Sequence, residues 1–396
     1  MDGLSLFVTT VICAAAVNYK RPRIGEGVKL SDKRHTVLST GTESIARALE
    51  DRQFVLGDRS VTVQPIPNLI RLPCGHEEWV IDYHAVARDS LGRIYVLYNS
   101  SSRFEYTRAL ARYHYVYDRE SDAGHFVFDT FLGTRDLADG TVHGMNIFFT
   151  HDDSSGTGSN ERILVVNQDR TFTLMDLDGK QILRKRHDEQ APEQPTTGVG
   201  LKSRAFIGVV DGYATSLNFL FSASDGAIVG CTGRKGSGDG ESNQNHGVDV
   251  DPNGDLVICD RKNTRLTWWR GEDFQPLYVG GAQKKLMMPG LQVCNASFLG
   301  EYAAVPCLNS TLAFLGPDAD HPSGYKVISV AQMPQELIDA GLDGIHDAEL
   351  TADGRYVVVA VWERHPETRQ LPTLTAFRIN WGEHAGAFDD AGVGSK

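Results

Sequence analysis

The sequence predicts an all-β fold, a six-bladed β-propeller. Short hydrophobic runs alternate with clusters of Gly, Asp, Asn and Ser along most of the 396 residues, a pattern of many short strands joined by tight turns. Strands headed by a histidine recur at His84, His143, His246 and His346. Their spacings are 59, 103 and 100 residues, which indicates a period near 50 with two further units lacking the histidine. A period of about 40 to 50 residues with about four strands per unit is typical of propellers, and six units fit the length.

The best-formed unit begins at His246 and reads as a β-hairpin. An alternating strand leads to the turn Pro252-Asn-Gly-Asp255, and a second strand, Leu256 to Cys259, leads away from it. Similar runs with a Gly-containing turn follow His84 and His346. The two units without a histidine lie around residues 207–221 and 289–315.

Three regions are expected along the chain. Residues 1–55 form an N-terminal arm packed on the propeller, with a short helix over 42–51; residues 56–385 form the propeller; and residues 386–396 form a flexible tail. The last unit shows only three strands, which begin near His346, Tyr356 and Leu374. We expect the missing strand to come from the N-terminal part, near 61–66 or 79–81, because this closes the ring and removes an exposed edge.

Composition and charge limit the kinds of partner that the protein is expected to bind. The net charge is −12 and no block rich in Lys or Arg is present, so nucleic acid is not expected to bind. The apolar run from Leu4 to Val17 is too short for a membrane span and follows an acidic residue, whereas a signal peptide begins with basic residues. We therefore expect that the protein does not associate with a membrane and that it is cytoplasmic, or secreted if this run acts as a signal. The six cysteines contain no C-x-x-C pair, so a zinc ribbon with thiolate ligands is not indicated. A small molecule is the expected partner.

The recurring histidines predict a metal site. The first strand of each blade lines the central channel, so a residue at its head points into one mouth of the channel. His143, His246 and His346 would head the second, fourth and sixth blades, about 120° apart around one axis. Three converging neutral imidazoles suit a transition metal, zinc first, with iron, copper and manganese as alternatives.

Specific segments resemble a known enzyme family. The run from Gly247 to Leu266 resembles an NHL repeat, and residues from about 80 to 365 resemble the catalytic propeller of peptidyl-α-hydroxyglycine α-amidating lyase. The matching segments are His346-Asp347 followed by Asp353-Gly354, Asp211-Gly-Tyr213, and Asp260-Arg261-Lys-Asn263.

The resemblance implies a zinc ion on His143, His246 and His346 and cleavage of a carbinolamide to an amide and an aldehyde. Tyr213 would be the base. Arg261 would lower the pKa of Tyr213 or bind a carboxylate, and Asp347 would orient an imidazole. Tyr213 also fits an ordinary packed aromatic, and Asp260 and Asn263 fit residues that stabilise a blade.

The sequence departs from that family at His84, where no histidine is expected. If His84 joins the other three, the site suits Fe(II), Mn or Cu, which accept five or six ligands. The first blade also offers only Arg103 as a poor match for a further arginine. Three hypotheses therefore stay open: a metal-dependent lyase acting on a small polar organic substrate, a four-histidine non-haem oxygenase or isomerase, and a non-catalytic NHL-like binding propeller.

Overall fold

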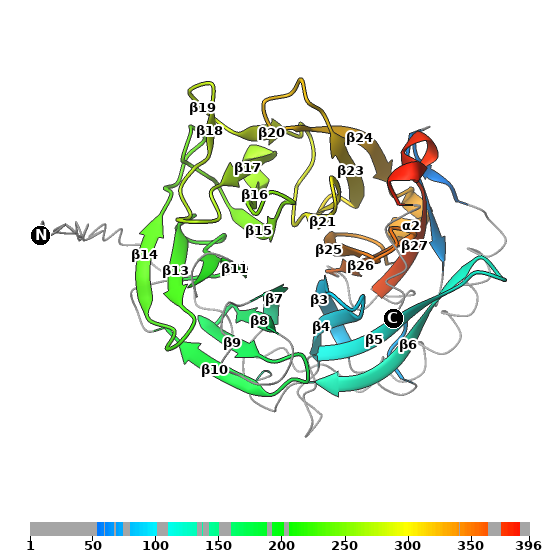
Figure 1. Ribbon diagram of the computed structural model, residues 1–396, viewed down its shortest axis with the longest axis horizontal. Coiled ribbons are helices and arrows are strands. Elements are labelled where there is room, and N and C mark those ends of the chain that lie inside the picture. Colours follow the sequence, from blue (N-terminus) through cyan, green and yellow to red (C-terminus); the bar gives the residue numbers. More distant parts are fainter. Residues whose placement is uncertain are drawn as a thin grey trace, which may run out of the picture.

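In the computed structural model, six antiparallel sheets form a ring of six blades around one axis (Figure 1). This confirms the predicted six-bladed propeller. The structure describes residues 54–58, 60–66, 69–73, 80–100, 110–132, 137, 142–149, 160–187, 192–201, 206–339, 341–362 and 374–388. The predicted arm up to residue 53, with the helix at 42–51, and the tail from residue 389 lie outside this part. Within it, no helix has the length and apolar character needed to cross a membrane.

Each of blades 1 to 5 consists of four strands in chain order, and the first strand is the innermost. Blade 1 consists of β3 (Val80–Arg88), β4 (Ile94–Ser100), β5 (Leu110–Asp118) and β6 (Ala123–Leu132). Blade 2 consists of β7 (Val142–Phe149), β8 (Glu161–Asn167), β9 (Thr171–Met175) and β10 (Gln181–Arg186). Blade 3 consists of β11 (Thr197–Leu201), β12 (Phe206–Val210), β13 (Asn218–Ser222) and β14 (Ile228–Thr232). Blades 4 and 5 are β15 (Asn245–Val250), β16 (Leu256–Asp260), β17 (Arg265–Trp269) and β20 (Lys285–Met287); and β21 (Ser297–Leu299), β22 (Tyr302–Cys307), β23 (Thr311–Pro317) and β24 (Tyr325–Gln332).

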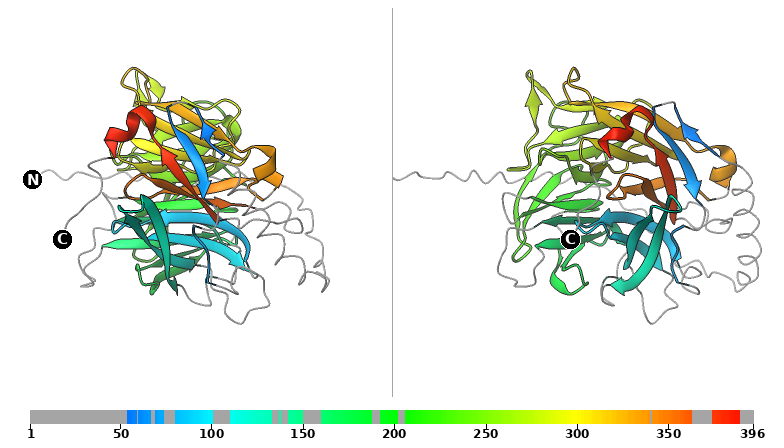
Figure 2. Two further views of the ribbon diagram at one scale, coloured as in Figure 1. Left: turned by 90° about the vertical axis from the view of Figure 1, so that its right-hand side faces the viewer. Right: turned by 45° about the vertical axis from the view of Figure 1, so that its right-hand side comes forward.

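Blade 6 joins the two ends of the propeller. Its strands are β25 (Ile345–Leu350), β26 (Tyr356–Val361), β27 (Leu374–Asn380), β2 (Thr62–Ile66) and β1 (Leu56–Gly57). In Figure 2 the blue β2 lies beside the red β27, and the register runs from Thr62 opposite Asn380 to Ile66 opposite Ala376. Val61 and Val63 are buried in the same core cluster as Phe377. The strand predicted at 61–66 therefore closes the ring, whereas Val80 of the alternative belongs to β3.

The predicted hairpin turn has the expected chemistry. Gly254 has a φ of +83°, a left-handed conformation that favours glycine. The Asp251 carboxylate accepts hydrogen bonds from the backbone N–H groups of Asn253 and Asp255, and its other oxygen accepts one from Trp268 Nε1. Gly92 and Gly354 have positive φ at the corresponding turns of blades 1 and 6. The repeat thus recurs in backbone conformation as well as in sequence.

The remaining elements lie outside the blade ladders. They are the hairpin β18 (Tyr278–Val279) and β19 (Ala282–Gln283), the helix α2 (Gln335–Asp339), and the 3₁₀ helices η5 (Arg261–Asn263) and η6 (Gly382–Ala387). After η6, Phe388 stacks on Trp381 with ring centroids 4.4 Å apart.

Candidate metal centre

Four histidines enter the centre of the ring from inner strands, each at an irregularity of its ladder. The register shifts between Tyr83 and Ala85 in β3, across Val142 and Gly144 in β7, across Asn245 and Val248 in β15, and across Ile345 and Asp347 in β25. A β-bulge re-aims the side chain at the extra residue. His84, His143, His246 and His346 occupy these bulges, and all four are buried.

Three of the four histidines form one compact group. The candidate ligand nitrogens of His143, His246 and His346 all lie within 4.8 Å of one another. His84 is not part of that group. Its ring packs beside those of His143 and His346, at centroid distances of 5.2 and 4.8 Å, and its Nδ1 lies 3.6 Å from Asp82 Oδ1. The structure therefore brings together the three histidines of alternate blades and places the fourth against them.

Backbone carbonyls hold all three rings of this group in the same way. His143 Nδ1 lies 2.9 Å from the Thr196 carbonyl oxygen, and His246 Nδ1 lies 3.0 Å from that of Cys294. His346 Nδ1 lies 2.7 Å from the carbonyl oxygen of His84. In every case the carbonyl belongs to the next blade around the ring, so each ring is fixed by a neighbour rather than by its own sheet.

These contacts define the tautomer of each imidazole. A carbonyl oxygen only accepts hydrogen bonds, so each Nδ1 carries the proton and each Nε2 keeps its lone pair. Burial is the main cause that lowers the pKa of all three imidazoles, and the charge of Arg261 also lowers it; the pKa of His143 falls to about 4. At neutral pH the group consists of neutral rings with a lone pair on each Nε2, which is the state that binds a transition metal.

The glycine after two of the histidines has a structural reason. A Cβ atom at Gly144 would lie 2.2 Å from the Thr196 carbonyl oxygen, and one at Gly247 would lie 2.3 Å from that of Cys294. These are the same carbonyls that hold His143 and His246. The His-Gly pair therefore lets the next inner strand approach closely enough for its carbonyl to reach the ring.

Tyr213 and Arg261 lie at the same centre. The Tyr213 hydroxyl is 3.0 Å from His246 Nε2 and 3.4 Å from His143 Nε2, and it donates because these nitrogens carry lone pairs. The Arg261 guanidinium carbon lies 5.3 Å from the centre of the Tyr213 ring. Burial raises the pKa of Tyr213 and Arg261 opposes this, so the expected lowering by Arg261 is present but burial outweighs it.

Arg261 itself is a buried cation. It is 6% exposed, and its side-chain contacts are the Tyr213 ring and Cys294 Sγ, which lies 3.8 Å from Nη1. Among the described residues no carboxylate pairs with it. By contrast, Asp260 accepts hydrogen bonds from Asn263 and Arg265, which fits the blade-stabilising role expected for Asp260 and Asn263.

Asp347 contacts neighbouring strands rather than an imidazole. Its carboxylate accepts hydrogen bonds from the Val86 and Ala348 backbone N–H groups and from Asn295 Nδ2. The orientation expected of it is supplied by the carbonyls instead. Burial raises the pKa of Asp347 to about 7 and that of Glu349, which pairs with Arg88 at 3.2 Å, to about 8.

Replacing Glu349 with Gln should stabilise the protein increasingly as pH rises from about 5 to about 8. In the folded state the pKa of Glu349 is raised to about 8, chiefly by burial; the negative charges of Asp249 and Asp347 also raise it, whereas Arg88 lowers it. The unfolded chain, with a glutamate pKa near 4.5, binds fewer protons in this range, so wild-type stability falls with rising pH. Because Gln does not titrate, the variant does not lose stability in this way as the pH rises.

Urea unfolding at three pH values across this range measures the effect. The stability difference between variant and wild type should widen by about 2 to 4 kcal/mol. The exposed Glu336 of α2, replaced by Gln, serves as the control and should show a constant difference. A constant difference for the Glu349 variant would contradict the prediction.

The space between the imidazoles is very small. The cavity that they line has a volume of about 10 Å³, which is about one water molecule or ion and far below that of an organic molecule. An organic ligand is therefore too large to fit between the rings.

Comparisons with known proteins add little to this picture. A scan against protein-family models found no match, and a search of curated proteins found none either. A search of solved structures found a crystal structure of a protein from Lactobacillus plantarum, determined by the Northeast Structural Genomics Consortium. It is 15% identical to this chain, the match covers 67% of this chain and 74% of that one, and the TM-score is 0.43. The fold rests on the sheet topology described above.

Proposed function

We propose that the protein is a metal-dependent enzyme that cleaves a small polar organic substrate in a lyase-type reaction at the channel mouth. The observation that carries this proposal is the set of three Nε2 lone pairs from alternate blades, each made available by a carbonyl on Nδ1. Three neutral histidines are a common ligand set for catalytic zinc, which keeps a further position for a substrate or water.

The environment of the three histidines favours an ion there. The three buried Nε2 atoms face one another as acceptors, and the Tyr213 hydroxyl lies within hydrogen-bond distance of two of them. The positive charge of Arg261 disfavours a cation nearby, and coordination bonds from three imidazole nitrogens would outweigh that repulsion. When bound, such a metal would act as a Lewis acid toward a substrate hydroxyl.

The substrate is expected to carry a carboxylate. Arg261 is a buried guanidinium whose described contacts are a thiol and an aromatic ring, and a planar guanidinium binds a carboxylate through two parallel hydrogen bonds. An anion placed there would lie against Tyr213 and above the histidines. Arg261 would thus orient the substrate, and the Tyr213 hydroxyl would lie next to the reacting group.

The reaction that fits these groups is the breakdown of a carbinolamide. With Tyr213 as the phenolate, which the charges of Arg261 and of a bound cation would favour, the substrate hydroxyl proton passes to the Tyr213 oxygen, the C–O bond becomes a carbonyl, and the C–N bond breaks with its electrons on nitrogen. A proton returns to nitrogen, so the products are an amide and an aldehyde and no oxidant is used.

N-benzoyl-α-hydroxyglycine tests this proposal because it joins a carbinolamide to a carboxylate. The protein is stripped with a chelator and reloaded with Zn²⁺, Mn²⁺ or Fe²⁺, and release of benzamide and glyoxylate is measured above the uncatalysed rate. Tyr213→Phe should lower kcat by about 100-fold, and Arg261→Met should raise KM by about tenfold. Tyr278→Phe, at an exposed tyrosine of blade 4, is the matched control. A lack of turnover with every metal would reject the lyase reaction.

His84 supports a second candidate, a four-histidine oxygenase or isomerase. The residue is buried, and in the described part of the chain its Nδ1 has no hydrogen-bond partner. If this ring turned toward the other three, it would add a fourth imidazole, which suits iron, manganese or copper better than tetrahedral zinc. Strong preference for Fe²⁺ in the reloading experiment, with oxygen consumption, would favour this alternative.

A further inference from the structure

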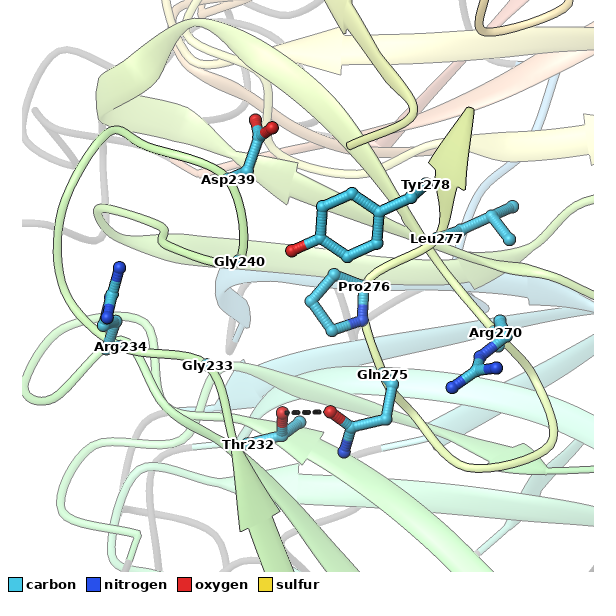
Figure 3. A pocket seen from close by; sticks show the side chains of 10 residues that line it. All are labelled: Thr232, Gly233, Arg234, Asp239, Gly240, Arg270, Gln275, Pro276, Leu277 and Tyr278. Atoms are coloured by element: carbon cyan, nitrogen blue, oxygen red, sulfur yellow. Dashed lines mark hydrogen bonds between the residues drawn. The ribbon is translucent and has the colours of Figure 1, made fainter. Parts of the chain in front are cut away.

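A second cavity lies on the rim of the ring, between blades 3 and 4 and apart from the histidines. Its volume is about 650 Å³, within the range of ligand sites, and Figure 3 shows the side chains around it. Arg234 and Arg270 lie on opposite sides, the Tyr278 ring lies between them, and the Thr232 hydroxyl meets the Gln275 side chain at 3.5 Å.

One wall of this rim cleft is a hairpin that the blade does not need. Trp268 of β17 pairs with the chain on both sides of this hairpin. Its carbonyl oxygen accepts a hydrogen bond from the Leu277 N–H, and its own N–H donates to the Lys284 carbonyl oxygen. The chain between Leu277 and Lys284 leaves the ladder as β18 and β19. Its base is closed by a 2.6 Å hydrogen bond from Lys284 N–H to the Leu277 carbonyl. This excursion carries Tyr278, which is 51% exposed.

The other wall is the loop of residues 233–244, and it is rigidly held. The buried Arg265 donates hydrogen bonds to the carbonyls of Ser237, Gly238 and Glu241. The loop is also tied to the hairpin, because Gly240 N–H donates to Gln283 Oε1 at 2.9 Å. The cleft is therefore preformed between two insertions of blade 4, which reduces the entropic cost of binding.

The ionic groups around the cleft are paired. Arg234 lies 2.7 Å from Glu241, Arg270 lies 2.7 Å from Asp273, and Lys285 lies 2.8 Å from Asp239. The cleft consequently has no excess charge to attract an anion such as phosphate. Its polar lining also disfavours an apolar ligand.

The lining instead matches a neutral ligand rich in hydroxyl groups. Planar side chains with two or more donor or acceptor atoms can contact two neighbouring hydroxyls, and those here are the donors Arg234 and Arg270, the acceptor Asp239, and Gln275, which has both. The exposed Tyr278 ring offers an apolar face on which the C–H groups of a sugar ring can pack. We propose that the rim cleft binds a saccharide, as a short segment of an oligosaccharide.

Binding to an array of immobilised neutral oligosaccharides tests this proposal, with calorimetric titration of the best binder. Tyr278→Ala should lower the affinity by at least about tenfold, Gln275→Ala by about fivefold, and Tyr278→Phe should bind like wild type. Met287→Ala, at a residue of the same blade that is 49% exposed and lies outside the cleft, is the matched control. Unchanged near-ultraviolet circular dichroism of each variant shows that the fold is retained.

Three outcomes would overturn the proposal. They are an array without any bound glycan, glycan binding that Tyr278→Ala leaves unchanged, and a wild-type cleft that binds inorganic phosphate but no glycan. The site of this test is remote from the histidines, so its outcome is independent of the proposed metal chemistry.

Discussion

The double variant His246→Ala/His346→Ala is expected to retain less than about a tenth of an equivalent of transition metal, where the wild type holds about one. Two of three ligand nitrogens are lost, and one imidazole with a tyrosine hydroxyl does not make a transition-metal site. Metal analysis of protein purified without added metal measures this directly.

Two further variants sharpen the result. The exposed pair His114 and His125 on the outer strands of blade 1, replaced together by Ala, should leave the metal content unchanged. His84→Ala should also retain the metal if three histidines bind it and lose most of it if four do. Equally low metal in wild type and in the His246→Ala/His346→Ala variant would refute the metal centre.

Gly247→Ala is expected to destabilise the protein by about 3 kcal/mol and to weaken metal binding by about tenfold. The new methyl group would lie 2.3 Å from the Cys294 carbonyl oxygen and 2.6 Å from Asn295 Cα, so the two inner strands must separate. That carbonyl also fixes Nδ1 of His246, and its displacement frees the ring to rotate.

Gly230→Ala in β14 is the matched control. There the nearest atom to a new Cβ is Leu220 Cδ1 at 3.6 Å, an ordinary contact, and the stability should change by less than about 0.5 kcal/mol. Chemical unfolding gives the stability, and a competition titration with a zinc chelator gives the affinity. If both glycine variants behaved alike, close approach of the strands would not be what holds His246.

Local patterns were sufficient to predict the ring, because alternation and turn glycines such as Gly254 are visible in a single sequence. The period of the histidines placed His143, His246 and His346 on alternate blades, and the structure gathers these three. The outcome at His84 was not predictable. β3 contains two register shifts, one between Val80 and Asp82 and one between Tyr83 and Ala85, and the angle of a ring at such a strand depends on the bulges.

The partners of the rings were equally hidden. Every residue has a backbone carbonyl, so the residue types at Thr196 and Cys294 do not indicate that their carbonyls accept a hydrogen bond from a histidine. The sequence does contain one sign of these contacts, which is the glycine after His143 and after His246. The reason for this glycine, the close approach of the next inner strand, becomes clear only from the structure. The rim cleft was missed for a related reason, since its walls meet through contacts such as Gly240 to Gln283.

The closure of the ring has a consequence for how the protein is made. His346 is fixed by the carbonyl of His84 across the junction between blades 6 and 1, and β2 pairs with β27 more than 300 positions later in the chain. This junction can form only after the last strand has been synthesised, so contacts of long sequence separation make it a late event in folding. An ion held by blades 2, 4 and 6 would bind only the closed ring, and its presence would therefore slow the opening of the seam and protect both termini of the propeller from proteolysis.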